Sequence, residues 1–302
     1  MESLYQAAFE IWNQGIIIAI SLFTTSPTSA AGGSLYSVAH SVYSTLASIA
    51  VPIATIFFLI AIIKDVVMTP PDQQIRRFFG DALRFGIMIG ILANLWEIMG
   101  VVIEVTDGIT NAIFPATSGG DTMLSMSADL QNLINQAKIL DPSPTIAGSG
   151  GFINWVGDMK DWCTTSLSEY MTKNFYLLLG GLITLITTIA ALVAIISCAF
   201  QRIIKPLIIM PFASITVAMG SGGSEASRVM TSYLKTFFGF CLSGAFMVIC
   251  IKLGAQLMTH IIYHATGGLL ADTIIMSVQT AAVPLVTAGL IKAIDSIIAR
   301  FF

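Results

Sequence analysis

The chain has 302 residues, of which 55% are apolar and only 10% are charged. An ordinary soluble domain is about 45–50% apolar and about 25% charged, so this chain has too few charges to cover a soluble surface. Its net charge of −3 also argues against a protein that binds nucleic acid through Lys and Arg. Composition therefore excludes a soluble globular enzyme and a disordered chain, and it predicts an all-α integral membrane protein.

The N-terminal segment carries Glu2 and Glu10 but no Lys or Arg, so it lacks the basic start of a cleaved secretory signal. We therefore expect it to be mature protein. Within residues 1–23, Leu4, Ala8, Ile11 and Trp12 share one side of a helix, which indicates an amphipathic helix on the outer face. We assign residues 1–34 to this outer helix and its loop. The pattern leaves open whether 1–23 cross the membrane or lie on it.

Five later segments are apolar enough, and near enough to about 20 residues, to cross a membrane as helices. They are residues 42–63, 85–111, 175–200, 236–258 and 273–298. The expected organisation is a first transmembrane pair in 35–113, an outer loop in 114–174 and three transmembrane helices in 175–302.

The basic residues indicate the orientation, since cytoplasmic segments carry an excess of Lys and Arg. If the N-terminus is outside, ten of the 14 Lys and Arg residues lie in inside segments and three lie in outside segments, while Lys252 lies within a span. The sequence thus predicts a multi-pass protein of the cytoplasmic membrane, with the N-terminus out and the C-terminus in. The inside ten are Lys64, Arg76, Arg77, Arg84, Arg202, Lys205, Arg228, Lys235, Lys292 and Arg300; the outside three are Lys138, Lys160 and Lys173.

Residues 206–219 are apolar but short, and Pro206 and Pro211 are expected to interrupt a helix there. Basic residues flank the segment on both sides, so a full crossing would place one flank outside. We expect a re-entrant or interfacial segment.

The second span carries small and acidic residues at alternating spacings of four and three, which places them on one helical face. Carboxylates cannot face lipid cheaply, so this face is expected to meet protein or water. The face fits either of two interpretations: a path for cations or protons, or a seam for helix packing and oligomer contact. We favour the seam. Glu97 is predicted to pair with Lys252, within or between subunits. The full stripe is Gly86, Gly90, Ala93, Glu97, Gly100, Glu104 and Asp107.

Two further groups are candidate docking sites. Basic residues near the inner face are expected to anchor lipid headgroups or dock a cytoplasmic partner; they are Arg76, Arg77, Arg84, Arg202 and Lys205. The outer loop is expected to hold two amphipathic helices, and an aromatic stripe there fits a membrane-interface belt or a partner-binding face. That stripe is Trp155, Trp162 and Tyr170.

No motif predicts catalysis. His260 and His264 have a metal-compatible i, i+4 spacing, but only Asp272 is a candidate third ligand, and a polar helix end is the better interpretation. The four cysteines form no C-x-x-C pair. We predict no catalytic residues, no metal and no cofactor, and hence not an enzyme.

One stretch of about 45 residues resembles a known family. Residues 201–219 read QRIIKPLIIMPFASITVAM, a Gly/Ser/Glu turn follows, and residues 233–244 read YLKTFFGFCLSG. With the predicted topology, this resembles the polytopic inner-membrane subunit of type IV secretion systems, the TrbL-type family that includes the sixth VirB component. It looks most like conjugation proteins of Gram-positive mobile elements.

The resemblance implies a channel or platform subunit that forms homo-oligomers in the cytoplasmic membrane. Partners implied are other secretion-system membrane subunits, cytoplasmic ATPases and lipids, with support for DNA or protein translocation or for pilus assembly. Because the predicted buried face is acidic, it would repel DNA, which favours a platform over a DNA-lined pore. The alternative is an ion- or proton-coupled solute transporter using Glu97, Glu104 and Lys252. A scaffold without conduction also remains open.

Overall fold

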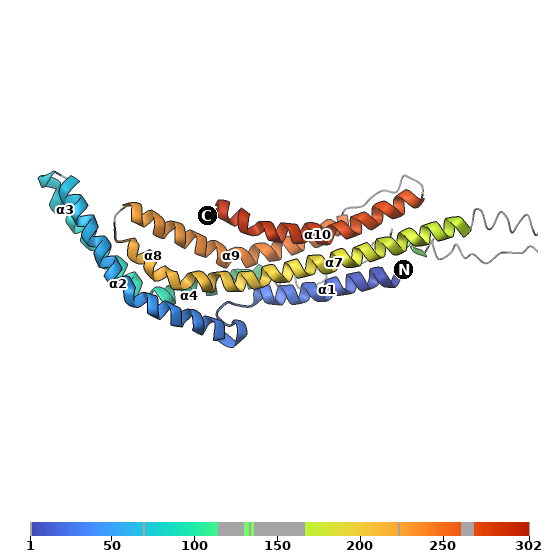
Figure 1. The fold of residues 1–302 in the computed structure, drawn as a ribbon, viewed down its shortest axis with the longest axis horizontal. Coiled ribbons are helices and arrows are strands. Elements are labelled where there is room, and N and C mark those ends of the chain that lie inside the picture. Colours follow the sequence, from blue (N-terminus) through green and yellow to red (C-terminus); the bar gives the residue numbers. More distant parts are fainter. Residues whose placement is uncertain are drawn as a thin grey trace, which may run out of the picture. The chain divides into compact units, whose positions relative to one another are not determined.

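The computed structural model describes residues 2–68, 70–113, 130–132, 134–135, 167–222, 224–260 and 269–301. These residues are helical almost throughout and include no strand, which confirms the all-α prediction (Figure 1). The main helices are α1 (Glu2–Thr24), α2 (Ser34–Met68), α3 (Pro71–Ala93), α4 (Leu95–Ile113), α7 (Leu167–Ile209), α8 (Ala213–Met219), α9 (Ser224–His260) and α10 (Leu269–Phe301). The 3-10 turns η1 (Ala30–Gly33) and η3 (Met210–Phe212) precede α2 and α8.

Five helical stretches in the described part are long and apolar enough to cross a membrane, but they are not the five predicted. Leu4–Thr24 joins the set, because α1 is an apolar helix of sufficient length. The predicted span 85–111 is not one helix, because Gln73–Ala93 and Leu95–Ile113 meet at a bend of 66°. If this bent pair is taken as one span, it is a sixth candidate crossing. The expectation of an uninterrupted second span was wrong.

Asn94 is the break between α3 and α4. Its backbone angles (φ −113°, ψ 13°) are not helical, and its side-chain amide donates a hydrogen bond to the Gly90 carbonyl at 3.3 Å. Asn competes with the helix for backbone groups in this way, which is why it favours helix ends.

Pro206 does not interrupt a helix, contrary to expectation. It lies inside α7, which continues to Ile209 before η3 and α8 complete a candidate span of Phe175–Met219. Proline is tolerated inside membrane helices because neighbouring groups satisfy the freed backbone. The expected interruption at Pro211 is confirmed, because α7 ends at Ile209 and Pro211 lies in η3. Both η3 and α8 pack against α2.

The chain divides into two compact units. In the first unit (1–18, 117–195 and 250–291), the start of α1 packs against α7 and α10. Tyr5 is fully buried and its hydroxyl shares a hydrogen bond of 2.9 Å with Ser277. A Cβ at Gly180 would overlap both of these side chains, so glycine permits the contact. The expected interfacial helix therefore packs into the protein along one face.

In the second unit (19–116, 196–249 and 292–302), α2 and α3 form a hairpin, and α2, α4, α8 and α9 share a core. The Ser221 hydroxyl, in the turn after α8, donates to the Ala54 carbonyl at 2.8 Å. Phe237 of α9 and Met99 of α4 are almost fully buried in this core.

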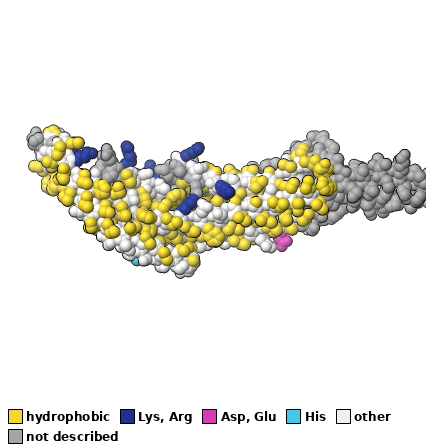
Figure 2. Space-filling view, viewed as in Figure 1, with side chains coloured by type: hydrophobic (Ala, Val, Ile, Leu, Met, Phe, Trp, Pro, Cys, Tyr) yellow, Lys and Arg dark blue, Asp and Glu magenta, His cyan; other side chains and the backbone are white. Residues whose placement is uncertain are grey.

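Four helices (α2, α7, α9 and α10) are longer than a bilayer requires, and many large apolar side chains are exposed. α7 has 43 residues, about 65 Å at 1.5 Å per residue, against a hydrocarbon thickness of about 30 Å. Figure 2 shows hydrophobic side chains over most of the described surface in that view. These features support a multi-pass membrane protein.

Candidate functional site

A buried ion pair joins α4 and α7 in the second unit. The Arg202 guanidinium donates from Nη2 to Oδ1 of Asp107 at 2.7 Å. Arg202 is only 2% exposed and Asp107 6% exposed. Both side chains are buried within the protein, so each charge would be costly to bury without the other.

A third helix completes this site. Gly244 of α9 lies so close to Arg202 that a Cβ at this position would overlap the guanidinium at Nε. Cys241, one turn earlier on α9, is buried in the adjacent core. Glycine at 244 therefore makes the space that the arginine fills, and the ion pair fixes three helices against one another.

The pair is not fully satisfied by the part of the chain that the structure describes. Oδ2 of Asp107 and Nε of Arg202 are buried there without a hydrogen-bond partner. Nη1 of Arg202 makes a long contact of 3.5 Å to the Thr25 carbonyl. The arginine neutralises the carboxylate, which weakens its attraction for a transported cation, so the site favours a structural role.

Sequence reasoning singled out both residues but did not pair them. Arg202 was expected to dock lipid or a partner at the inner face, and this was wrong because its side chain is buried. Asp107 was expected in a seam paired, if at all, with Lys252. The available signal was that the two charges have opposite signs and lie next to long apolar stretches, where a charge requires a partner.

The rest of the acidic stripe is not buried by its own chain. Glu97 and Glu104 are exposed on α4, whereas Gly100 is half-buried, and a Cβ at Gly100 would lie 3.5 Å from the Tyr36 hydroxyl. The break at Asn94 divides the stripe between two helices. Its remaining members are also exposed; they are Gly86, Gly90 and Ala93.

The other basic candidates are more accessible. Arg76 and Arg77 are exposed on α3, Arg84 is half-buried, and Arg77 pairs weakly with Asp65 at 4.0 Å. The Lys205 ammonium lies 5.7 Å from the centre of the Phe240 ring, a cation–π contact. All three arginines of α3 remain candidates for docking.

Several predicted residues cannot be placed together. Glu97 and Lys252 belong to different units, so their pairing stays a prediction. Trp155, Trp162 and His264 lie outside the described residues, and of Tyr170, His260 and Asp272 only the helical backbone is described. Across the described ranges, no three His, Cys, Asp or Glu side chains come together as a metal site.

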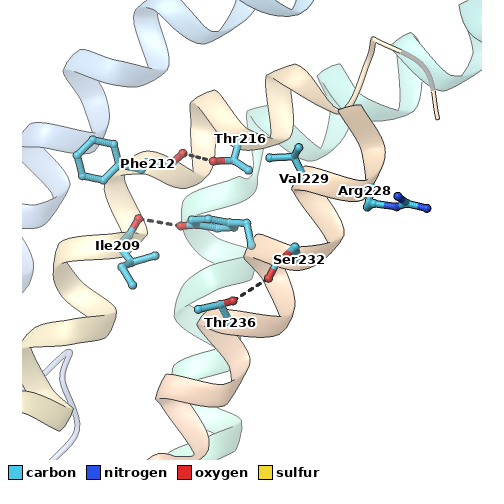
Figure 3. A pocket seen from close by; sticks show the side chains of 8 residues that line it. Ile209, Phe212, Thr216, Arg228, Val229, Ser232 and Thr236 are labelled. Atoms are coloured by element: carbon cyan, nitrogen blue, oxygen red, sulfur yellow. Dashed lines mark hydrogen bonds between the residues drawn. The ribbon is translucent and has the colours of Figure 1, made fainter. Parts of the chain in front are cut away.

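A groove between η3–α8 and α9 is a second feature of this unit, with a volume of about 670 Å³ (Figure 3). Its lining is mostly apolar, with Arg228 at the edge. The lining residues are Ile209, Phe212, Thr216, Arg228, Val229, Ser232, Tyr233 and Thr236.

No protein-family model, curated protein or solved structure matches this chain.

Proposed function

We propose that this chain is a channel or platform subunit of a type IV secretion system for conjugative DNA transfer. It would form homo-oligomers in the cytoplasmic membrane, contact other secretion subunits and ATPases, and support substrate translocation or pilus assembly. The TrbL-like segment at 201–244 suggests the system, and the exposed acidic face of α4 supports the role of an assembly subunit.

The α4 face carries the argument. Glu97 and Glu104 are exposed beside Val101 and Val105, which are 56% and 55% exposed. In a bilayer, such a face would place carboxylates against lipid, at a cost of about 2.5–3.5 kcal/mol for each charged side chain near the helix centre. Another protein surface, or water enclosed by several subunits, removes that cost. An oligomeric or partner-bound subunit accounts for the face.

The sign of the charge favours a platform over a pore wall for DNA. Two exposed carboxylates would repel a phosphate backbone. The buried arginine, Arg202, already neutralises Asp107 and is not available to bind DNA.

For orientation, we propose that the C-terminus lies inside. Removing buried Arg202 from the ten inside basic residues leaves nine against three outside, and the Lys and Arg bias keeps the same direction. The proposal of an outside N-terminus holds if α1 does not cross. If α1 crosses and α2 keeps its direction, the N-terminus lies inside.

An ion- or proton-coupled transporter is the second candidate. The same observation supports it, because exposed Glu97 and Glu104 could line water between subunits. It differs in expected behaviour: purified protein in liposomes would conduct ions, and E97Q would abolish the flux.

Disulfide cross-linking in native membranes tests the oligomer. In a background with all four cysteines changed to alanine, we expect E97C and E104C to form dimers between copies. Ile56→Cys and Val193→Cys are matched controls, since both native side chains are well exposed on other helices (57% and 64%), and they should cross-link far less. Equal cross-linking at all four positions, or none at 97 and 104, would reject this face as the oligomer seam. Ion flux lost in E97Q would favour the transporter.

A further inference from the structure

The groove of the second unit has a largely apolar surface. Phe212 and Val229 line it and are 51% and 48% exposed. The Tyr233 hydroxyl donates to the Ile209 carbonyl at 2.7 Å, which holds the ring between α7 and α9 (Figure 3). Its volume of about 670 Å³ is in the usual range of ligand pockets, about 300–1,000 Å³.

Its threonines add little polarity. The Thr216 hydroxyl donates to the Phe212 carbonyl at 3.0 Å, and the Thr236 hydroxyl donates to the Ser232 carbonyl at 2.9 Å. Both hydroxyls are therefore used in hydrogen bonds to the backbone one turn earlier in the chain. The groove is thus more hydrocarbon-like than its residue types suggest.

The polar groups lie toward one end. Arg228 is in the first turns of α9, and Ser232 follows at i+4 on the same helical face. Beyond them the groove continues to Thr236, within the candidate span Ser227–Gln256. Among the side chains that the structure describes, which do not include those of residues 223–226, no carboxylate lies within ion-pair distance of Arg228. The groove thus has a cation near the N-terminal end of α9, at the start of the candidate span, and an apolar surface that continues along the span.

We propose that this groove binds an anionic phospholipid of the phosphatidylglycerol class. The lipid phosphate would accept hydrogen bonds from the Arg228 guanidinium and the Ser232 hydroxyl. An acyl chain would lie on Val229, Phe212 and the Tyr233 ring. This charge complementarity distinguishes an anionic lipid from a zwitterionic one. The proposal does not depend on the secretion role.

The test uses the full chain in lipid nanodiscs with phosphatidylglycerol or phosphatidylcholine carrying a photoreactive group in the acyl chain. Phosphatidylglycerol should label peptides containing Phe212 or Val229, about fivefold more than phosphatidylcholine does, since one basic residue near an anionic lipid contributes about 1 kcal/mol. R228Q should remove that preference, and R228K should restore part of it. V229W, which fills the groove, should reduce labelling by both lipids. K235Q is the matched control, because Lys235 is exposed on α9 but does not line the groove.

Several results would overturn the proposal. Equal labelling by both lipids would show no anionic preference. An equal loss in K235Q and R228Q would indicate general attraction to the membrane surface. Competition by inorganic phosphate at millimolar concentration would indicate a site for free phosphate. A photo-cross-linker placed at Phe212 that captures a second copy of the chain would assign the groove to a protein interface.

Discussion

Removing one charge from the Asp107–Arg202 pair is expected to destabilise the chain by about 3–5 kcal/mol, because the remaining charge stays buried without a partner. The structure sets this magnitude: the two atoms are 2.7 Å apart and the side chains are only 8% and 1% exposed. The reference is Arg77–Asp65, at 4.0 Å with side chains 53% and 31% exposed. Loss of that pair in R77Q should cost less than about 1 kcal/mol.

The double variant separates a partner effect from simple loss of packing. D107L with R202M removes both charges and the two unsatisfied atoms, Oδ2 and Nε. Replacing a whole buried pair with apolar side chains is often neutral or stabilising. We therefore expect the double variant to be more stable than either D107L or R202M alone.

The assay is unfolding of the purified full chain in mild detergent titrated with sodium dodecyl sulfate. Helix content from far-ultraviolet circular dichroism gives the free energy of unfolding. Two outcomes would refute the reasoning: single variants no less stable than R77Q, or a double variant whose loss equals the sum of the two single losses.

Three smaller predictions use the same unfolding assay. G244A should lower the free energy of unfolding by about 1–3 kcal/mol, since its Cβ would overlap Arg202. The control G86A, with nothing within 4 Å of its Cβ, should leave stability unchanged or raise it slightly. Equal effects of the two substitutions would contradict the packing argument. G180A should destabilise because its Cβ would overlap both Ser277 and the Tyr5 hydroxyl, and unchanged stability would reject the overlap. Y233F should cost about 1 kcal/mol by removing the donor to the Ile209 carbonyl, and unchanged stability would show that this bond contributes nothing.

Composition and hydropathy were sufficient to predict an all-α membrane protein, because long apolar stretches leave few alternatives to helices in a bilayer. They were less able to locate helix ends. Asn disfavours the helix interior too weakly for Asn94 to predict a break within an apolar segment. Proline disfavours it strongly, but the membrane environment lets α7 continue through Pro206. Residue type alone was therefore too weak a signal at Asn94 and a misleading one at Pro206.

The candidate site was predictable only in part. Asp107 and Arg202 were visible as costly charges, but they are 95 positions apart in the chain, and spacing along one helix cannot identify a partner on another. Gly244 gave no signal at all, since its role depends on how closely Arg202 approaches. The groove beside Arg228 likewise arises from two helices that the sequence treats separately.

The central claim is that the chain serves a type IV secretion system, and DNA transfer to recipient cells tests it most directly. In cells that encode the chain, deleting its gene should abolish conjugative transfer without slowing growth. The wild-type gene should restore transfer, and R77Q should restore it too. D107L, which is expected to unfold the second unit, should not. Transfer that continues at the wild-type frequency after deletion would contradict the account.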